Sequence, residues 1–350
     1  MSLLPVCFEP AFVPRIWGAW SLAPLYPEKT SLAEPIGEVW LTGDHCCFAT
    51  GPFAGRTVGE VWCELPAEWT GTRLRAEPAF PLLVKFLFPE EILSVQVHPD
   101  DHYAQEHESA RGGRGKTEMW YVVEARPGAE VLVGLKAGVA EDAFQQAIED
   151  GTVEQCLRRI PIQPGDAIFV PAGTVHTIGP GSVLCEIQEN SDITYRLFDY
   201  NRRTADGTPR ELHIERGLDV VEFGAQSGGR HEPVRINRGP LRETYFLACR
   251  YFATEKWEFA ERIAAVTSLE HFDLLIFLNG SGRIESSGGS VDYNRAQAWM
   301  LPAALGAYRI SPEAPTVLLR TFVPDIANDF VRRLADQRIV EAEWSRLVFP

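Results

Sequence analysis

The stretch QPGDAIFVPAGTVHTIG, residues 163–179, predicts two short strands joined by a tight turn. A Gly-containing turn precedes the apolar segment AIFV, and a Pro-Ala-Gly turn separates this segment from a second strand near His176. Short apolar segments bounded by Gly and Pro are typical of β-structure. We expect the turn to aim His176 toward the inside of the protein.

Segments of the same kind occur along most of the chain. Residues 82–98, LLVKFLFPEEILSVQVH, combine an apolar run with a short alternating stretch. Residues 116–124 and 131–135 predict a hairpin around the turn RPGAE, and the β signal returns from about Tyr245. Many short strands, separated by turns rich in the 29 Gly and 25 Pro residues, predict a mainly β fold, either a sandwich or jelly-roll barrels.

A few segments depart from this strand pattern. Residues 139–150 carry apolar side chains at helical spacing and predict a helix that stops at Gly151. The segment that follows Pro209 also has helical character, whereas residues 99–115 predict a polar loop. These accessory segments lie in the first two thirds of the chain.

A weak internal repeat relates the two halves. Matching residues 168–178 to residues 299–310 aligns Pro171 with Pro302 and places Ala307 opposite His176. The pattern predicts two barrels of one kind, of which only the first has polar residues at the site positions. We expect a catalytic domain with accessory helices at 1–222, a linker at 223–240 and a degenerate barrel domain at 241–350.

The charge balance restricts the possible partners. The chain has 33 Lys and Arg against 48 Asp and Glu, a formal net charge of −15, which argues against a broad surface for nucleic acid or for an anionic membrane. An anionic ligand therefore needs a local cluster of Arg and Lys.

The cysteines and the N-terminus indicate the compartment. The seven cysteines form no CxxC pair, as expected for reduced thiols. The N-terminal segment MSLLPVCFEPAF lacks a basic region before an apolar run, and no later run approaches the ~18 apolar residues of a membrane span. We expect a cytoplasmic protein without a membrane partner.

Four side chains from three separate segments form the candidate metal site. Gln96 and His98 alternate on one strand face, Glu118 lies on a second strand, and His176 follows the tight turn. Such mixed nitrogen and oxygen ligation suits zinc and also Mn, Fe, Co or Ni. Structural alternatives remain for each residue: a hydrogen-bonded histidine, an ion pair between Glu118 and Lys116, and a buried amide at Gln96.

Five successive motifs resemble those of the type I mannose-6-phosphate isomerases in their short bacterial form. They are SVQVHPDD (94–101), GKTEMWYVVEA (115–125), VPAGTVHTIG (170–179), EIQENSDITYRLFDYNR (186–202) and PRELHIERGLDVV (209–221). The resemblance implies two cupin (jelly-roll) β-barrels and the interconversion of mannose 6-phosphate and fructose 6-phosphate with one zinc ion in the first barrel. Its implied metal ligands are Gln96, His98, Glu118 and His176, and its substrate site contains Lys116, Arg196 and Asp192.

The expected reaction moves a proton between two carbons through an enediol. We expect Arg196 to stabilise the enediolate or the phosphate, Lys116 to position substrate or transfer a proton, and Asp192 to orient these groups or join the relay. The base stays open among Glu189, Asp192, Lys116 and a metal-bound water. Further candidates for contacting the phosphate are Arg202 and Arg203, with Arg111 and Arg114 as a lid.

Two other functions stay open. The first is an isomerase that acts on another sugar or sugar phosphate, because a fold hosts many activities. The second is a cupin that binds a metal or a sugar without isomerase activity.

Overall fold

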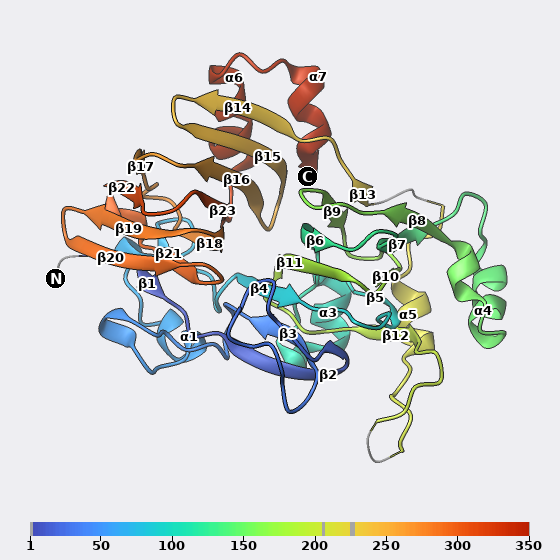
Figure 1. The fold of residues 1–350 in the computed structure, drawn as a ribbon. Helices are drawn as coiled ribbons and strands as arrows, with labels where there is room; N and C mark the ends of the chain where they lie inside the picture. Colours follow the sequence, from blue (N-terminus) through green and yellow to red (C-terminus); the bar gives the residue numbers. More distant parts are fainter. Residues whose placement is uncertain (1–2, 205–206, 225–227, 350) are drawn as a thin grey trace. The chain divides into compact units, whose positions relative to one another are not determined.

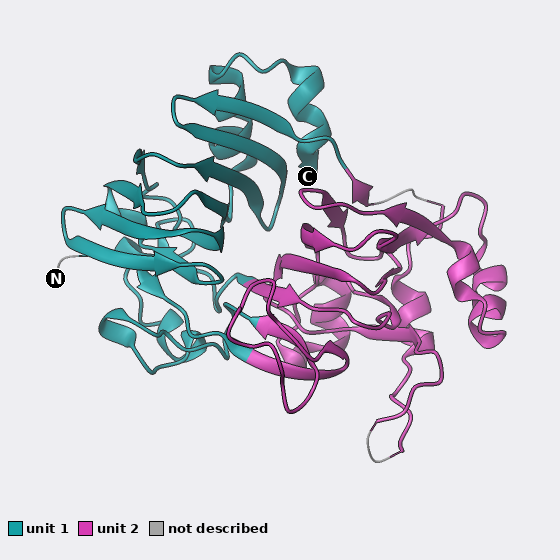
Figure 2. Cartoon of the chain, viewed as in Figure 1, with its two compact units in different colours: residues 1–11, 40–82, 231–350 teal, residues 12–39, 83–230 magenta. Residues whose placement is uncertain are grey.

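The computed structural model describes residues 3–204, 207–224 and 228–349 and divides the chain into two compact units, in which strands predominate (Figure 1). Unit 2, magenta in Figure 2, consists of residues 12–39 and 83–230. Unit 1, teal in Figure 2, consists of residues 1–11, 40–82 and 231–350. The compact units are thus discontinuous in sequence, whereas the expected domains are continuous.

Unit 2 contains two sheets. The first has the strand order β13 (Gly229–Arg230), β9 (Ala167–Val170), β6 (Glu118–Ala125), β11 (Ser182–Glu189), β4 (Leu82–Leu87), β3 (Ile36–Trp40) and β2 (Ala11–Ala19). The second has the order β12 (Tyr195–Phe198), β5 (Val95–Val97), β10 (His176–Ile178), β7 (Glu130–Leu135) and β8 (Leu157–Pro161). Buried side chains from both sheets, among them Trp120, Ile168, Val131 and Ile178, form one core between them.

The helices of unit 2 belong to a second apolar cluster. They are α3 (Asp101–His107), α4 (Glu141–Glu149) and α5 (Ile214–Val220), with the 3₁₀ turns η2 (Ser109–Arg111) and η3 (Val153–Cys156). Phe144 and Ile148 of α4 are buried in this cluster with side chains of β5, β7 and β12. The helices expected near 139–150 and after Pro209 are both present.

Helix α3 corrects one expectation, because it lies in the segment 99–115 predicted as a polar loop. The Asp100 side chain caps the helix by accepting a hydrogen bond of 2.8 Å from the backbone N–H of Tyr103. An aspartate at this position satisfies a backbone donor that the first helical turn leaves open. Ala104 is fully buried and anchors the helix to the apolar cluster.

Unit 1 also contains two sheets. The first has the order β1 (Val6–Cys7), β21 (Ala298–Leu301), β18 (Asp273–Asn279), β23 (Thr316–Phe322), β16 (Ala253–Phe259), β15 (Leu241–Cys249) and β14 (Val234–Arg238), with β24 (Val348–Phe349) paired to β15. The second has the order β17 (Ile263–Val266), β22 (Ala307–Pro312), β19 (Ser281–Ser286) and β20 (Gly289–Asn294). Its accessory elements are α1 (Val58–Trp62), α2 (Ala67–Thr70), α6 (Arg332–Asp336), α7 (Glu341–Trp344), the π-helical turn η5 (Ile326–Val331) and the 3₁₀ turns η1 (Gly51–Phe53), η4 (Ala303–Leu305) and η6 (Ser345–Leu347).

The two units repeat one strand order. The path β9-β6-β11-β4-β3-β2 of unit 2 corresponds to β21-β18-β23-β16-β15-β14 of unit 1, and β5-β10-β7-β8 corresponds to β17-β22-β19-β20. The register agrees as well, because Glu118 pairs with Val170 and Asp273 pairs with Leu301. Two jelly-roll barrels of one kind are therefore present, and the mainly β prediction is confirmed.

The segment 223–240 differs from a plain linker. Strand β13 and strand β14 both lie within it, whereas residues 225–227 of the expected linker lie outside the described residues. Within the part of the chain that the structure describes, every helix is too short or too polar to cross a membrane.

Candidate metal centre and its cavity

Three side chains from three strands of unit 2 converge inside its barrel. Glu118 begins β6, His176 begins β10 and His98 directly follows β5. All three are buried, and their potential ligand atoms lie within 4.8 Å of one another. The Glu118 carboxylate is 3.4 Å from Nε2 of His176 and 3.6 Å from Nε2 of His98. The structure thus brings together three of the four predicted metal ligands.

Backbone carbonyls orient both imidazole rings. Nδ1 of His98 lies 2.9 Å from the carbonyl oxygen of Ile193, and Nδ1 of His176 lies 2.9 Å from that of Thr174. A carbonyl oxygen only accepts, so in each neutral ring Nδ1 carries the hydrogen and Nε2 keeps a lone pair on the side of Glu118, where a cation can bind both groups.

Burial also keeps these rings neutral. Loss of solvation lowers the pKa of His176 to about 4 and that of His98 well below its ordinary value, and the Lys116 ammonium lowers both further. Two neutral imidazoles and a carboxylate are the donor set of a divalent transition-metal ion such as zinc. The side chains of His98, Glu118 and His176 are therefore suited to bind a divalent metal ion.

Gln96 lies beside this cluster through the strand register. Its Cα pairs with that of His176 in β10 on one side and with that of Arg196 in β12 on the other. The amide Nε2 of Gln96 is 3.2 Å from Nε2 of His176. Half a turn of the amide presents its oxygen to the same place, so Gln96 is within reach of the position of a fourth ligand.

Lys116 connects the cluster to a cavity. Its buried ammonium lies 2.9 Å from the Glu118 carboxylate and 3.2 Å from Nε2 of His98. Burial opposes the charge on Lys116, but the carboxylates of Glu118 and Glu186 outweigh burial and raise the pKa of Lys116. Lys116 is thus a fixed positive charge at neutral pH.

The cavity has a volume of about 560 Å³ and is lined by Gln96 and Lys116 on the side of the cluster. Its other charged lining residues are Arg15, Glu38, Lys85, Arg111, Glu186, Asp192, Arg196, Arg210 and Glu211. Among the described lining residues, Arg and Lys side chains outnumber the carboxylates. This local excess is what an anionic ligand requires in a chain with a net charge of −15.

Each predicted substrate residue lies at this cavity. Arg196 donates a hydrogen bond of 2.8 Å to the backbone oxygen of Glu211, while its buried Nε finds no partner among the described residues. Burial is the largest cause that lowers the pKa of Arg196, and the positive charge of the neighbouring Arg210 lowers it further. Asp192 is half exposed, and its carboxylate lies 3.5 Å from Lys85.

Several further candidates do not line the cavity. Arg202 pairs with Asp199, Arg203 donates to a nearby backbone oxygen, and Arg114 is not a lining residue. Glu189, a candidate base, is buried and accepts a hydrogen bond of 2.7 Å from the backbone N–H of Thr117. Arg111 does line the cavity, as expected for a residue at its rim.

Sequence reasoning missed a buried charge cluster at the cavity. The Lys85 ammonium lies 3.7 Å from Glu186 and 3.8 Å from Glu38, in addition to its contact with Asp192. Lys85 occupies a central position in the fully buried strand β4. A single lysine inside the apolar run FPLLVKFL is the signal that could have found this cluster.

The double-sheet jelly roll with an inward-facing His/Glu/His cluster under a cavity defines a cupin-type β-barrel protein. A family model described as "Phosphomannose isomerase type I, catalytic domain" matches residues 9–121, and one described as "Mannose-6-phosphate isomerase, cupin domain" matches residues 242–319. The chain is 38% identical over 310 residues to the probable mannose-6-phosphate isomerase GmuF of Bacillus subtilis, covering 87% of this chain and 96% of the relative. It therefore belongs to the type I phosphomannose isomerase family.

Other relatives agree with this assignment. The mannose-6-phosphate isomerase ManA of Bacillus subtilis is 35% identical, with 91% of this chain and 99% of the relative covered. The crystal structure of the mannose 6-phosphate isomerase from Bacillus subtilis superposes with a TM-score of 0.82 at 31% identity, covering 91% of this chain and 99% of that one. The resemblance found in the motifs and the predicted cupin fold are both confirmed.

Proposed function

We propose that this chain is a metal-dependent aldose–ketose isomerase that interconverts mannose 6-phosphate and fructose 6-phosphate. The observation that carries the proposal is the position of the His98, Glu118 and His176 cluster beside a cavity with an excess of cationic side chains. Membership of the family supports the substrate, and the seven scattered cysteines without a CxxC pair support a cytoplasmic location.

One zinc ion held by Gln96, His98, Glu118 and His176 is the proposed cofactor. A solved mannose 6-phosphate isomerase described as "holo; zinc bound" shares the fold of this chain, with a TM-score of 0.71 at 16% identity. Bound at this cluster, the ion would supply a Lewis acid for the negative charge that develops on the oxygens of the enediol. The second-sphere contacts of both histidines with backbone carbonyls keep the ligand nitrogens in the form that binds metal.

The protein side chains bind and orient the substrate. Lys116 lines the cavity beside the cluster and donates hydrogen bonds to substrate oxygens. Arg196 lines the cavity and offers its guanidinium to the phosphate or the enediolate. Among the candidate bases, Glu189 does not line the cavity, whereas Asp192 and Lys116 do. We propose Asp192 for the proton relay, with Lys116 as the alternative side chain.

The experiment that tests the substrate is nuclear magnetic resonance of the purified, metal-replete enzyme with mannose 6-phosphate. Fructose 6-phosphate should form, and free mannose at the same concentration should turn over far more slowly, because only the phosphate uses the cationic lining. Equal turnover of both sugars would favour the isomerase of free sugars instead. Binding without turnover of either would favour the non-catalytic cupin.

A further inference from the structure

Three arginines gather around a single carboxylate at the cavity of unit 2. Asp199 is buried and directly follows β12. Arg210 donates to the Asp199 carboxylate through Nε, at 2.7 Å, and through Nη2, and Arg202 donates to it through Nη2 at 2.6 Å. Arg196, the third arginine, forms no ion pair among the described residues and lines the cavity with Arg210. These four residues form the arginine cluster.

The arginine cluster has an excess of two positive charges, because three guanidinium groups share one carboxylate. Burial is the largest cause that lowers the pKa of Arg196, and the positive charges of Arg210 and Arg202 lower it further. These charges are therefore close enough to repel one another. Glu211 also lines the cavity, but its carboxylate is 83% exposed and water screens its charge. A phosphate group, with about two negative charges at neutral pH, relieves the repulsion.

The other cations of this cavity already have a carboxylate within ion-pair distance. Their N–O distances lie between 2.9 and 3.7 Å: Lys116 pairs with Glu118, Arg15 with Glu38, Lys85 with Glu186 and Arg111 with Glu108. The unmatched positive charge of the lining is thus concentrated at the arginine cluster.

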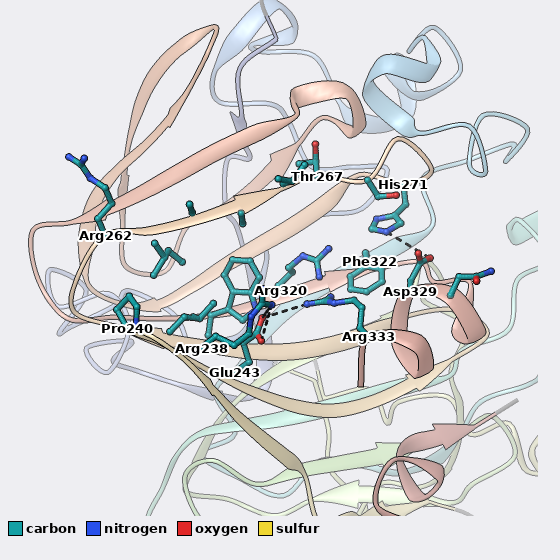
Figure 3. Close-up of a pocket in the computed structure, with 18 residues that line it drawn as sticks. Arg238, Pro240, Glu243, Arg262, Thr267, His271, Arg320, Phe322, Asp329 and Arg333 are labelled. Atoms are coloured by element: carbon teal, nitrogen blue, oxygen red, sulfur yellow. Dashed lines mark hydrogen bonds and ion pairs between the residues drawn. The ribbon is translucent and has the colours of Figure 1, made fainter. Parts of the chain in front are cut away.

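The cavity of unit 1, of about 700 Å³, shows a different arrangement of arginines (Figure 3). Three of its four lining arginines share three carboxylates: Arg238, Arg320 and Arg333 pair with Glu243, Glu255 and Asp273. Figure 3 shows Arg238 and Arg333 meeting at Glu243. In the arginine cluster of unit 2, by contrast, three arginines share one carboxylate.

Strand register sets the distance between the arginine cluster and the metal ligands. Arg196 in β12 pairs with Gln96 in β5, which pairs with His176 in β10. Adjacent strands lie roughly 4.8 Å apart, so the backbone of Arg196 lies two strand spacings, roughly 10 Å, from that of His176. The open chain of a hexose 6-phosphate has a comparable length between its first carbon and its phosphorus. A substrate with its reacting carbons at the metal ligands can therefore reach the arginine cluster with its phosphate.

Asp199 fixes the guanidinium of Arg210 at the cavity. Both oxygens of the Asp199 carboxylate accept from Arg210, and this bidentate contact restricts the orientation of the guanidinium. Nη1 of Arg210 has no hydrogen-bond partner among the described residues. Arg196 in turn donates at 2.8 Å to the backbone oxygen of Glu211, the residue after Arg210. One local network thus holds both guanidinium groups that line the cavity.

We propose that Arg210, positioned by Asp199, binds the phosphate of the substrate together with Arg196 and thereby gives the enzyme its preference for phosphorylated sugars. This role rests on the proposed isomerase function and adds the side chains that distinguish a sugar phosphate from a free sugar. Arg210 contacts the phosphate, whereas Asp199 acts through Arg210 as a positioning residue.

Binding of mannitol 1-phosphate tests the role of Arg210. This polyol phosphate is the reduced form of mannose 6-phosphate and cannot be isomerised, so isothermal titration calorimetry of the holoenzyme measures binding alone. Arg210→Gln should weaken its binding by a factor of about 10 or more, because a charged donor to the phosphate is lost, while binding of mannitol stays unchanged. Arg203→Gln is the matched control, since Arg203 is exposed and does not line the cavity.

Steady-state kinetics with mannose 6-phosphate supply a second readout. Arg210→Gln should raise KM and change kcat much less, because a contact remote from the reacting carbons binds the ground state and the transition state alike. A residue needed only for folding would instead lower the amount of active enzyme, and so the apparent kcat, without a change in KM.

Asp199→Asn separates positioning from charge. The variant makes the arginine cluster more positive, so it would bind mannitol 1-phosphate more tightly if Asp199 acted through its charge alone. A positioning role requires weaker binding and a higher KM, because Arg210 loses its bidentate partner. Asp199→Glu, which keeps a carboxylate, should restore part of the affinity.

Circular dichroism and thermal unfolding establish that each variant is folded. Should Arg210→Gln not fold, Arg210→Lys, which keeps a cation beside Asp199, takes its place and should weaken binding by a smaller factor. Unchanged affinity of the folded Arg210 variant for mannitol 1-phosphate would overturn the role of Arg210, as would equal affinity of the parent protein for mannitol and its phosphate. Tighter binding by Asp199→Asn would overturn the role of Asp199. A parent protein that binds mannitol 1-phosphate through Arg210 but does not isomerise mannose 6-phosphate would contradict the proposed function alone.

Discussion

Asp273 begins β18 at the register position that Glu118 occupies in β6, yet the two carboxylates have different partners. Glu118 faces two imidazoles, whereas Asp273 accepts a hydrogen bond from the Arg320 guanidinium. One barrel frame thus carries a metal-type cluster in one unit and a buried ion pair in the other.

Glu118→Gln should lose bound metal and lower kcat/KM roughly 100-fold or more, because an amide is a weaker ligand than a carboxylate. Metal content per chain and isomerase activity are measured on the same sample. Glu124→Gln is the matched control, since Glu124 is an exposed residue of the same strand. Full metal content in Glu118→Gln would remove this residue from the ligand set.

Arg196→Ala should lower kcat/KM by a factor of roughly 100 to 1,000 and leave the metal content unchanged, because it removes a charged donor from the cavity. Steady-state kinetics with mannose 6-phosphate provide the measurement. Arg203→Ala is the control, since Arg203 does not line the cavity. Near-normal turnover in a folded Arg196→Ala protein would exclude Arg196 from the mechanism.

Lys85→Met should destabilise the protein by about 3 kcal/mol, because it removes the cation nearest to the buried Glu186 carboxylate, whereas Glu38 keeps its ion pair with Arg15. Thermal and urea unfolding measure the loss. Adding Glu186→Gln should restore part of the stability, since it removes that carboxylate. If the double variant is no more stable than Lys85→Met, Lys85 and Glu186 do not stabilise the fold through their interaction.

The ionisation of Asp273 should make the free energy of unfolding depend on pH in the acid range. Burial opposes its charge, but Arg320 outweighs burial and lowers the pKa of Asp273 to about 2. A carboxyl group with a lower pKa in the folded chain than in the unfolded chain stabilises the fold. This contribution is complete above the pKa of the unfolded chain, near 4, and is lost as pH falls through about 2.

Asp273→Asn should therefore be less stable than the parent by about 2 to 3 kcal/mol at pH 7, and the difference should shrink as pH falls from about 4 to about 2. Urea unfolding across this pH range is the measurement. A difference that does not change with pH would mean that the Asp273 carboxyl titrates alike in the folded and unfolded chains.

The strand pattern could be predicted because it depends on local signals. The two barrels followed from the internal repeat, and the site of His98, Glu118 and His176 followed from the resemblance of the motifs together with strand alternation. Turns with Gly and Pro delimit strands, and alternation places side chains on one face. Helix α3 escaped prediction because its signal is one capping aspartate and one buried alanine within a polar segment.

Other features depend on contacts between distant segments and could not be predicted. Residues 40–82 belong to unit 1 because their side chains pack against its barrel, as Trp62 does against Phe272 with ring centroids 5.9 Å apart. The charge cluster around Lys85 joins three strands and a loop, and no single segment contains its pattern. Arg210 lines the cavity and the predicted Arg202 does not, because the position of each side chain depends on contacts between distant segments.

Removal and restoration of the metal ion show whether isomerase activity depends on it. The purified enzyme is treated with a chelator, its mannose 6-phosphate isomerase activity is measured, and one equivalent of zinc is added while circular dichroism monitors the fold. Activity should disappear with the fold intact and return as zinc binds. Full activity in the metal-free protein, or no activity after zinc has rebound, would contradict the proposed metal dependence.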